Sequence, residues 1–263
     1  MEVMSIDGMQ FCWVPAGDFL MGDDASKTRL DYGYWLARYP VTAAQFRVYV
    51  DETNIELSKE YFNVVPANHP MVWVSWHEAI KFCDWLSERW QAKGWLPDGW
   101  MVSLPSEAEW EKAARGGQEI PATTLVQPPP FGLMSPTLHE NKKPARAYPW
   151  GNDEDPERMN FSETEIWRTS TVGCFPGGAS PYGAEELSGN VWEWTRSLKK
   201  GYPYDSTDGR EDLKAQGSRV LRGGAFSSSA GYARCACRGD SDPDDRYYGL
   251  GFRVVVSPFF SER

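Results

Sequence analysis

The sequence has little of what builds a histidine-rich metal centre or a membrane span. Its 263 residues include only 3 histidines. These residues, His69, His77 and His139, are far apart in the sequence, which argues against a metal centre built from histidines. No run of about 18 apolar residues is present, so the sequence predicts no membrane span.

Cysteines are also few. The five cysteines are scattered, and their odd number leaves at least one thiol unpaired. A disulfide scaffold needs denser and even-numbered cysteines, so we expect free thiols that are buried or half-exposed. The cysteines are Cys12, Cys83, Cys174, Cys235 and Cys237.

Positive charge is scarce relative to negative charge. The formal net charge is −10, from 37 acidic and 27 basic side chains. A chain of that charge repels phosphate backbones, which excludes nucleic acid as an expected partner. The first residues lack a basic stretch followed by an apolar core, so no signal peptide is predicted, and a cytoplasmic or phage-associated location is expected.

Aromatic residues, glycine and proline are abundant instead. The chain contains 13 Trp, 24 Gly and 19 Pro, and 14% of its residues are aromatic. Helix signals are limited to three stretches, which begin after the capping residues Thr42, Ser75 and Ser106. The third stretch ends at Gly116.

The remaining apolar runs are short and are interrupted by Gly, Pro and Asp, a pattern typical of short strands joined by long loops. These runs cover residues 11–15, 101–105, 191–195, 219–224 and 251–256. The sequence therefore predicts an α+β fold with few short helices, in one domain over residues 1–263. Residues 118–147, which contain Pro128-Pro129-Pro130, are expected to be a peripheral surface insertion.

The short motifs form an ordered series over nearly the whole chain. This series resembles the formylglycine-generating-enzyme-like (sulfatase-modifying-factor) domain, a branch of the C-type lectin fold. The resemblance implies a C-type lectin-like α+β domain in which Trp110, Trp150, Trp192 and Trp194 are buried framework residues. The motifs are FLMG (19–22), YPVTAAQF (39–46), VSWHEAIKFCDWL (74–86), SLPSEAEWEKAARGG (103–117), YPWGN (148–152), YGAEELSGNVWEWT (182–195), RVLRGGAF (219–226) and GFRVV (251–255).

The resemblance also implies where an oxidase of this family would hold copper. Its first copper cysteine lies about four residues beyond the second glycine of the RGG motif, where this chain has Ser227, Ser228 and Ser229. The following segment is about three residues shorter here, so the second cysteine has no counterpart. A serine hydroxyl cannot replace a thiolate that binds Cu(I), so we expect no enzyme activity and no required cofactor. A formylglycine-generating oxidase or a sulfatase-modifying relative remains the alternative.

One metal site of the family has counterparts in this chain. The family holds a calcium ion around the GNVWEW turn through side-chain oxygens and main-chain carbonyls, which suit this hard cation. The matching positions are Glu186, Gly189, Val191 and Glu193. The resemblance therefore implies a calcium site, and a salt-bridged turn is the alternative.

Residues 227–249 combine two sets of residues. One set resembles framework: Ala230, residues 233–238, Pro243 and Arg246. The fourteen other positions are all Ser, Gly, Asp or Tyr, although these types make up only 74 of the 263 residues. The fourteen are Ser227, Ser228, Ser229, Gly231, Tyr232, Gly239, Asp240, Ser241, Asp242, Asp244, Asp245, Tyr247, Tyr248 and Gly249.

The four residue types share a genetic origin. Each is reached from an Asn codon, AAC or AAT, by changing adenines alone. The segment and its flanks RVLRGG and GFRVV resemble the variable region of diversity-generating retroelement variable proteins, which use this lectin-type domain. The resemblance implies that the fourteen positions form a hypervariable ligand-binding face for a protein or another macromolecule. The alternative is an ordinary polar loop on an unspecialised lectin-like binding module.

Overall fold

Three helices begin at the predicted capping residues. The computed structural model describes residues 5–55 and 64–258, and in it the helices are α1 (Ala43–Thr53), α3 (Trp76–Ala92) and α4 (Glu107–Arg115). Thr42, Ser75 and Ser106 each form a capping box with the residue three positions on. Each box satisfies two backbone N–H groups that the first turn of a helix leaves unpaired, which explains why the chain turns into a helix there.

In the described residues, short strands form two larger sheets and two two-stranded sheets. The five-stranded sheet has the order β5-β13-β4-β1-β7, and the four-stranded sheet has the order β11-β10-β9-β12. The two-stranded sheets are the hairpin β2-β3 and the pair β6-β8, whose strands are not consecutive in the chain. The strands are β1 (Phe11–Val14), β2 (Gly17–Met21), β3 (Ser26–Leu30), β4 (Tyr34–Ala37), β5 (Met101–Ser103), β6 (Glu119–Pro121), β7 (Val126–Gln127), β8 (Leu138–Glu140), β9 (Trp192–Leu198), β10 (Arg219–Arg222), β11 (Gly239–Ser241), β12 (Leu250–Phe252) and β13 (Val255–Ser257).

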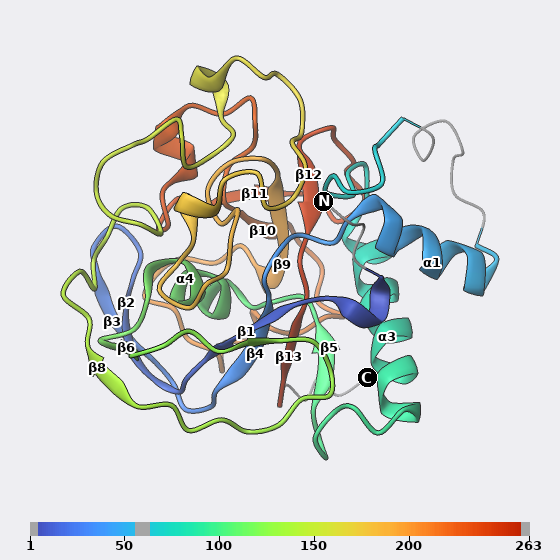
Figure 1. The fold of residues 1–263 in the computed structure, drawn as a ribbon, viewed down its shortest axis with the longest axis horizontal. Helices are drawn as coiled ribbons and strands as arrows, with labels where there is room; N and C mark the ends of the chain where they lie inside the picture. Colours follow the sequence, from blue (N-terminus) through green and yellow to red (C-terminus); the bar gives the residue numbers. More distant parts are fainter. Residues whose placement is uncertain (1–4, 56–63, 259–263) are drawn as a thin grey trace.

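The helices and loops cover different sides of these sheets. Helices α1 and α3 lie together at the right of Figure 1, whereas strands β2, β3, β6 and β8 lie at the left and long loops fill the upper left of the view. Within the described residues the loops contain four short 3₁₀ turns: η1 (Ile6–Gly8), η2 (Ser162–Thr164), η3 (Pro176–Gly178) and η4 (Ala230–Ala233). No helix in the described part of the chain has the length and apolarity that a membrane crossing requires.

The run GFRVVV, expected to be one strand, is divided between the two larger sheets. Its first residues end β12, which pairs with β9, and its last residues begin β13, which pairs with β4 and β5. Arg253 lies at the junction, fully buried, and donates to both carboxylate oxygens of Glu193 and to the backbone carbonyls of Ala37 and Glu185. The arginine therefore joins the two sheets at the point where the strand breaks.

Helix α4 lies in the interior, although five of its nine residues are charged. All nine residues are buried, and its three glutamates pair with arginines from elsewhere in the chain. Glu109 accepts from Arg196 at 2.6 Å, and Glu111 accepts from the buried Arg222. The sequence predicted this helix correctly, but its charges gave no indication that it would be central.

Two of the four predicted framework tryptophans are only partly buried. Trp110 and Trp194 have no exposed surface, and their indole N–H groups donate to Glu193 and to the carbonyl of Val74. Trp150 and Trp192 are half-buried. The ring of Trp150 stacks on Tyr148, and the ring of Trp192 contacts the exposed Tyr232. Trp110 and Trp194 are therefore core residues, whereas Trp150 and Trp192 pack against the core with part of their surface exposed.

The segment 118–147 is less peripheral than the sequence indicates. Strand β7 adds to the five-stranded sheet by pairing with β1, and the backbone N–H of Trp13 donates to the carbonyl of Leu125. The ring of Phe131 is buried and contacts Phe11 at 4.9 Å and Trp90 at 5.6 Å between ring centroids. The expectation of a wholly peripheral insertion is wrong here, because an aromatic side chain among prolines supplies part of the core.

The five cysteines are free thiols, as predicted. Cys12, Cys83 and Cys235 are buried and Cys237 is half-buried, but Cys174 is exposed. Burial raises the pKa of Cys12 and of Cys235 to about 12, so neither thiol supplies a thiolate near neutral pH.

Candidate functional site

Residues 227–249 connect two strands of the four-stranded sheet. The segment leaves β10, passes through η4, returns as the outer strand β11, and turns into β12. Strand β11 pairs with β10 in antiparallel register, with Asp240 opposite Val220. Both ends of the segment are therefore fixed by a sheet, and the loops between the fixed points are presented to solvent.

The exposure of this segment follows the division drawn from residue types. Of the fourteen Ser, Gly, Asp and Tyr positions, nine are exposed. Of the nine framework positions, only Arg246 is exposed, and Ala230, Ala233, Cys235 and Ala236 are buried. The nine exposed positions, which we call the display face, are Ser227, Ser229, Gly231, Tyr232, Asp240, Asp242, Asp244, Tyr247 and Tyr248.

Framework residues anchor the segment mainly through its backbone. The hydroxyl of Ser188 donates to the carbonyl of Ala233 at 2.7 Å, and the guanidinium of Arg222 donates to the carbonyl of Cys237 at 2.7 Å. Arg238 reaches inward and pairs with the buried Glu107 of α4. These contacts fix the path of the chain without using any side chain of the display face.

The other five predicted positions have structural roles. Ser241 is 8% exposed, and its hydroxyl donates to the Asp245 carboxylate at 2.5 Å. This hydrogen bond, with a second from Tyr247, lowers the pKa of Asp245 and closes the turn before Tyr247. The hydroxyl of Ser228 accepts from the backbone N–H of Ala225 at 3.0 Å.

Two glycines in this group have neighbours where a side chain would begin. A Cβ atom on Gly249 would lie 3.0 Å from the Cβ atom of Ala225, and one on Gly239 would lie 3.3 Å from Leu221 and from Trp192. Gly231, in contrast, has open space around its Cβ position. The prediction of fourteen displayed positions is therefore too broad, and nine positions fit it.

Three tyrosines give the display face its apolar area. Tyr232, Tyr247 and Tyr248 are 57%, 46% and 56% exposed. Tyr248 meets the Trp73 ring edge-on at a centroid distance of 5.0 Å, and Tyr232 lies 6.4 Å from Trp192. Aromatic rings that are half exposed and contact a neighbouring ring offer contact area at a low cost in side-chain entropy, a feature common in binding surfaces.

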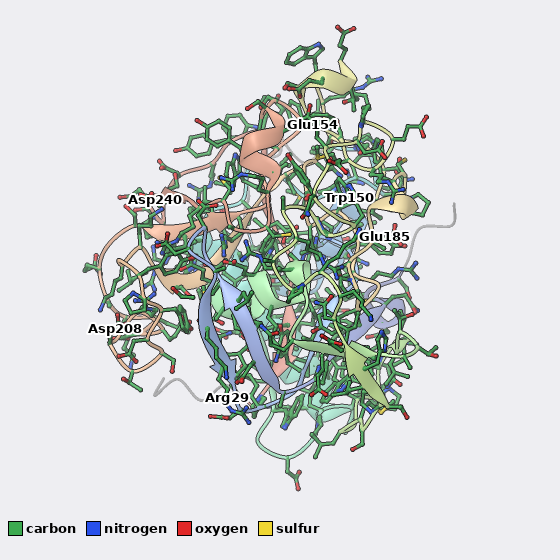
Figure 2. All side chains as sticks on the ribbon, turned by 90° about the vertical axis from the view of Figure 1, so that its left-hand side faces the viewer. Arg29, Trp150, Glu154, Glu185, Asp208 and Asp240 are labelled. Carbon is green, nitrogen blue, oxygen red and sulfur yellow. The ribbon has the colours of Figure 1, made fainter. Side chains whose placement is uncertain are left out.

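Aspartates give the same face its negative charge. Asp240, near the left edge of Figure 2, lies 3.2 Å from the ammonium group of Lys199, and Asp244 lies 3.8 Å from the imidazole of His77. Both contacts are at exposed side chains, where ion pairs contribute little to stability. These carboxylates therefore remain accessible to a bound partner.

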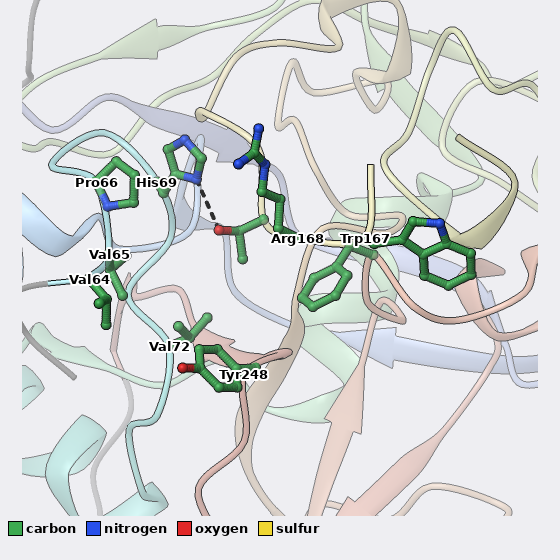
Figure 3. A pocket seen from close by; sticks show the side chains of 10 residues that line it. Val64, Val65, Pro66, His69, Val72, Trp167, Arg168 and Tyr248 are labelled. Carbon is green, nitrogen blue, oxygen red and sulfur yellow. Dashed lines mark hydrogen bonds between the residues drawn. The ribbon is translucent and has the colours of Figure 1, made fainter. Parts of the chain in front are cut away.

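A pocket that sequence reasoning missed adjoins the display face. It has a volume of about 620 Å³, and Tyr248 and Phe226 form part of its wall. Figure 3 shows His69 beside Arg168 at one side of the pocket, with Val72 and Tyr248 at the other. Its lining comes from segments near residues 64–72, 167–169, 226 and 248, so no local sequence pattern could reveal it.

The predicted calcium positions do not form a cation site. Both carboxylate oxygens of Glu193 accept from Arg253 at 2.7 Å, and one also accepts from the indole of Trp110. The Glu186 carboxylate accepts from the backbone of Gly173 and from Asn190, and the carbonyl of Gly189 accepts from the N–H of Val191. The oxygen atoms of Glu186, Gly189 and Glu193 therefore already accept hydrogen bonds, and the guanidinium of Arg253 supplies the positive charge beside Glu193. The residues present do not fit calcium.

Burial has a further effect on Glu186. It raises the pKa of this carboxyl to about 8, and the hydrogen bonds from Asn190 and Gly173 only partly offset this effect.

In the described residues no cluster of three or more His, Cys, Asp or Glu side chains is arranged to bind a metal ion. The serines at the copper position include Ser228, whose hydroxyl forms part of a turn.

Comparison with known proteins assigns the family. The model of the sulfatase-modifying factor enzyme 1-like domain matches residues 3–258. The chain belongs to this family. The match confirms the C-type lectin-like α+β fold, with few helices and several short sheets, that the motif series implied.

Members and structural neighbours of the family differ in what they do. Mouse formylglycine-generating enzyme is 25% identical over 92% of this chain and 74% of its own length. The mouse protein named inactive C-alpha-formylglycine-generating enzyme 2 is 27% identical over 93% of this chain and 84% of its own length. The solved structure of variable protein 1 from Treponema denticola has a TM-score of 0.66 at 18% identity, covering 93% of this chain and 94% of that chain. A relative named as an enzyme, a relative named as inactive and a variable protein are thus all similar to this chain.

Proposed function

We propose that this protein is a non-enzymatic ligand-binding protein whose display face is diversified by a retroelement. The proposal rests on one observation: within residues 227–249, the positions selected by residue type largely agree with the positions that are exposed to solvent. Residue type separates Ser, Gly, Asp and Tyr from the framework set, and exposure places nine of those fourteen positions, but only one of the nine framework positions, at the surface. A segment in which nine of ten exposed positions are Ser, Gly, Asp or Tyr suits side-chain exchange on a constant backbone.

The physical basis is separation of folding from binding. The anchoring contacts of the segment involve backbone carbonyls and framework residues such as Ala233, Cys237 and Arg238. Exposed side chains with few fixed partners contribute little to stability, so they can change without loss of the fold. Loops on a rigid scaffold carry recognition in many binding proteins for the same reason.

The composition of the face indicates what kind of ligand it suits. Tyrosine provides large, stiff contact area, and serine, glycine and aspartate provide adaptable polar contacts. The aspartates favour a basic or mixed surface on a protein or another macromolecule, and the net charge of −10 argues against nucleic acid. The shared fold with a Treponema denticola variable protein supports the display interpretation.

The second candidate is an oxidase, because mouse formylglycine-generating enzyme aligns with most of the chain. The serines at the copper position argue against it, since a hydroxyl is a poor ligand for Cu(I). The test is incubation of the purified protein with copper and a cysteine-containing sulfatase peptide, followed by mass spectrometry. Conversion of cysteine to formylglycine would replace the binding proposal with the enzyme proposal.

The decisive experiment for diversification examines the genome of the source organism. We expect a reverse transcriptase gene near the coding sequence, together with a second copy of the DNA that encodes residues 227–249. The two copies should differ only where the second copy has adenine. Absence of both the gene and the repeat would contradict the proposal.

A further inference from the structure

The pocket beside the display face differs from it in one respect. Of the ten residues that line the pocket, only Tyr248 belongs to the display face. The other nine lie outside the fourteen positions. Under the proposed function, the display face would change between variants while nearly all of the pocket stays the same.

The pocket has one apolar wall and one polar corner. Val64, Val65, Val72, Phe226 and Tyr248 provide aliphatic and aromatic surface. In an acidic protein, such a concave apolar site suits an aliphatic or aromatic group of a ligand.

The polar corner consists of His69, Arg168 and Thr169. The Nδ1 atom of His69 lies 2.9 Å from the hydroxyl of Thr169. Burial lowers the pKa of His69, and the charge of Arg168 lowers it further. The imidazole is therefore neutral near pH 7, and the guanidinium of Arg168 is the positive charge at this corner (Figure 3).

Arg168 differs in its surroundings from the exposed Arg29 and Arg246 and from the half-buried Arg234. Arg29, Arg234 and Arg246 each pair with a carboxylate, at 2.6, 2.5 and 3.0 Å. In the described parts of the chain, no carboxylate lies within ion-pair distance of Arg168. An arginine with no carboxylate partner among the described residues, at the edge of an apolar pocket, is available to a carboxylate from outside.

We infer that this pocket binds an apolar group that carries a carboxylate, with the carboxylate at Arg168 and the apolar part against Val72, Phe226 and Tyr248. This inference rests on the proposed function and deepens it, because it adds a contact whose residues, apart from Tyr248, lie outside the variable face. The C-terminal residue of a partner protein and a small free carboxylic acid share this chemistry, and the experiment below separates the two sources.

The test titrates the full chain by calorimetry with three probes. The first is the peptide acetyl-Gly-Gly-Phe with a free C-terminus, the second is its C-terminal amide, and the third is 3-phenylpropanoate. We expect the free-acid peptide to bind about tenfold more tightly than the amide, since a charge-assisted hydrogen bond is lost in the amide. Comparable binding of 3-phenylpropanoate would indicate a small acid as ligand, and preference for the peptide would indicate a C-terminus.

Variants locate the binding at the pocket. Arg168→Gln should weaken binding of the free-acid peptide about tenfold and leave the amide unchanged. Lys142→Gln, which removes the same charge from an exposed residue outside the pocket lining, should change neither. The inference is wrong if free acid and amide bind equally, if neither binds, or if Lys142→Gln and Arg168→Gln act alike.

A further variant separates this inference from the proposed function. The double variant Tyr232→Ser/Tyr247→Ser alters the display face but no residue that lines the pocket. It should keep its affinity for the free-acid peptide. Loss of peptide binding in this variant would show that the probe binds the face and would overturn the inference, whereas the genomic test judges diversification alone.

Discussion

The display face and helix α4 use similar polar residues in opposite ways. Three glutamates of α4 are fully buried and pair with arginines such as Arg196, Arg222 and Arg238. The aspartates of the display face are exposed, and their ion pairs lie at the surface. A buried charge must keep its partner to avoid a desolvation cost, whereas an exposed charge can be exchanged. Whether a charged position is free to vary therefore depends on whether its side chain is buried against an ion-pair partner, and not on the residue type.

The largest effect should follow from removing a buried framework ring. Trp194 has no exposed surface, and its indole N–H donates to the carbonyl of Val74 at 2.9 Å. We expect Trp194→Ala to lower the free energy of unfolding by about 3–5 kcal/mol, through lost burial and an unfilled cavity. Urea denaturation measures this, and Trp192→Ala, at a half-buried ring, serves as the milder control. Equal losses in the two variants would contradict the burial difference.

The next prediction concerns segment 118–147. Phe131→Ala should lower the free energy of unfolding by about 3 kcal/mol, because the ring packs against Phe11 and Trp90. Leu133→Ala, at a side chain that is 74% exposed in the same segment, should change it by less than about 0.5 kcal/mol. If Phe131→Ala has a negligible effect in thermal and urea melts, the whole segment is a peripheral insertion after all.

A pH-dependent effect of intermediate size is expected at Glu186. Its pKa is raised to about 8 in the folded chain, so the folded state holds a proton that the unfolded state releases above its ordinary pKa of 4.5. The stability from this group is fully present below pH 4.5 and is lost as the pH rises to 8. Glu186→Gln cannot ionise, so its free energy of unfolding should fall less over this range. Parallel pH profiles for the two proteins would contradict this assignment.

The smallest effect should come from the display face itself. Replacing Tyr232, Asp240, Asp242 and Asp244 together with Ser should change the free energy of unfolding by no more than about 0.5 kcal/mol per site. The matched control is Ser241→Ala, which removes the hydroxyl that holds the Asp245 carboxylate and should cost about 1 kcal/mol. A fourfold variant that unfolds as readily as Trp194→Ala would show that the face is structural.

Much of the fold could be predicted from local signals. Capping residues defined the three helices, and the ordered motifs identified the family, because each signal lies within about ten residues of sequence. The split of GFRVVV into two strands was not predictable, since it depends on Arg253 reaching Glu193 and Ala37 across the core. The burial of Phe131 likewise depends on distant rings.

The candidate site was only partly predictable for the same reason. Residue types separated the display face from the framework in advance. They did not reveal that Ser241 and Asp245 close a turn, or that Gly249 contacts Ala225. The pocket around Arg168 was invisible, because its walls come from four separate parts of the chain.

The most direct test of the account compares two libraries of this protein on a cell surface. One library randomises the nine positions of the display face, and the other randomises the nine framework positions of residues 227–249. Resistance to a protease during mild heating reports the fraction of folded members. We predict that most members of the display-face library stay folded, whereas most members of the framework library unfold. Equal loss of folded members in both libraries would contradict the claim that this segment separates binding from folding.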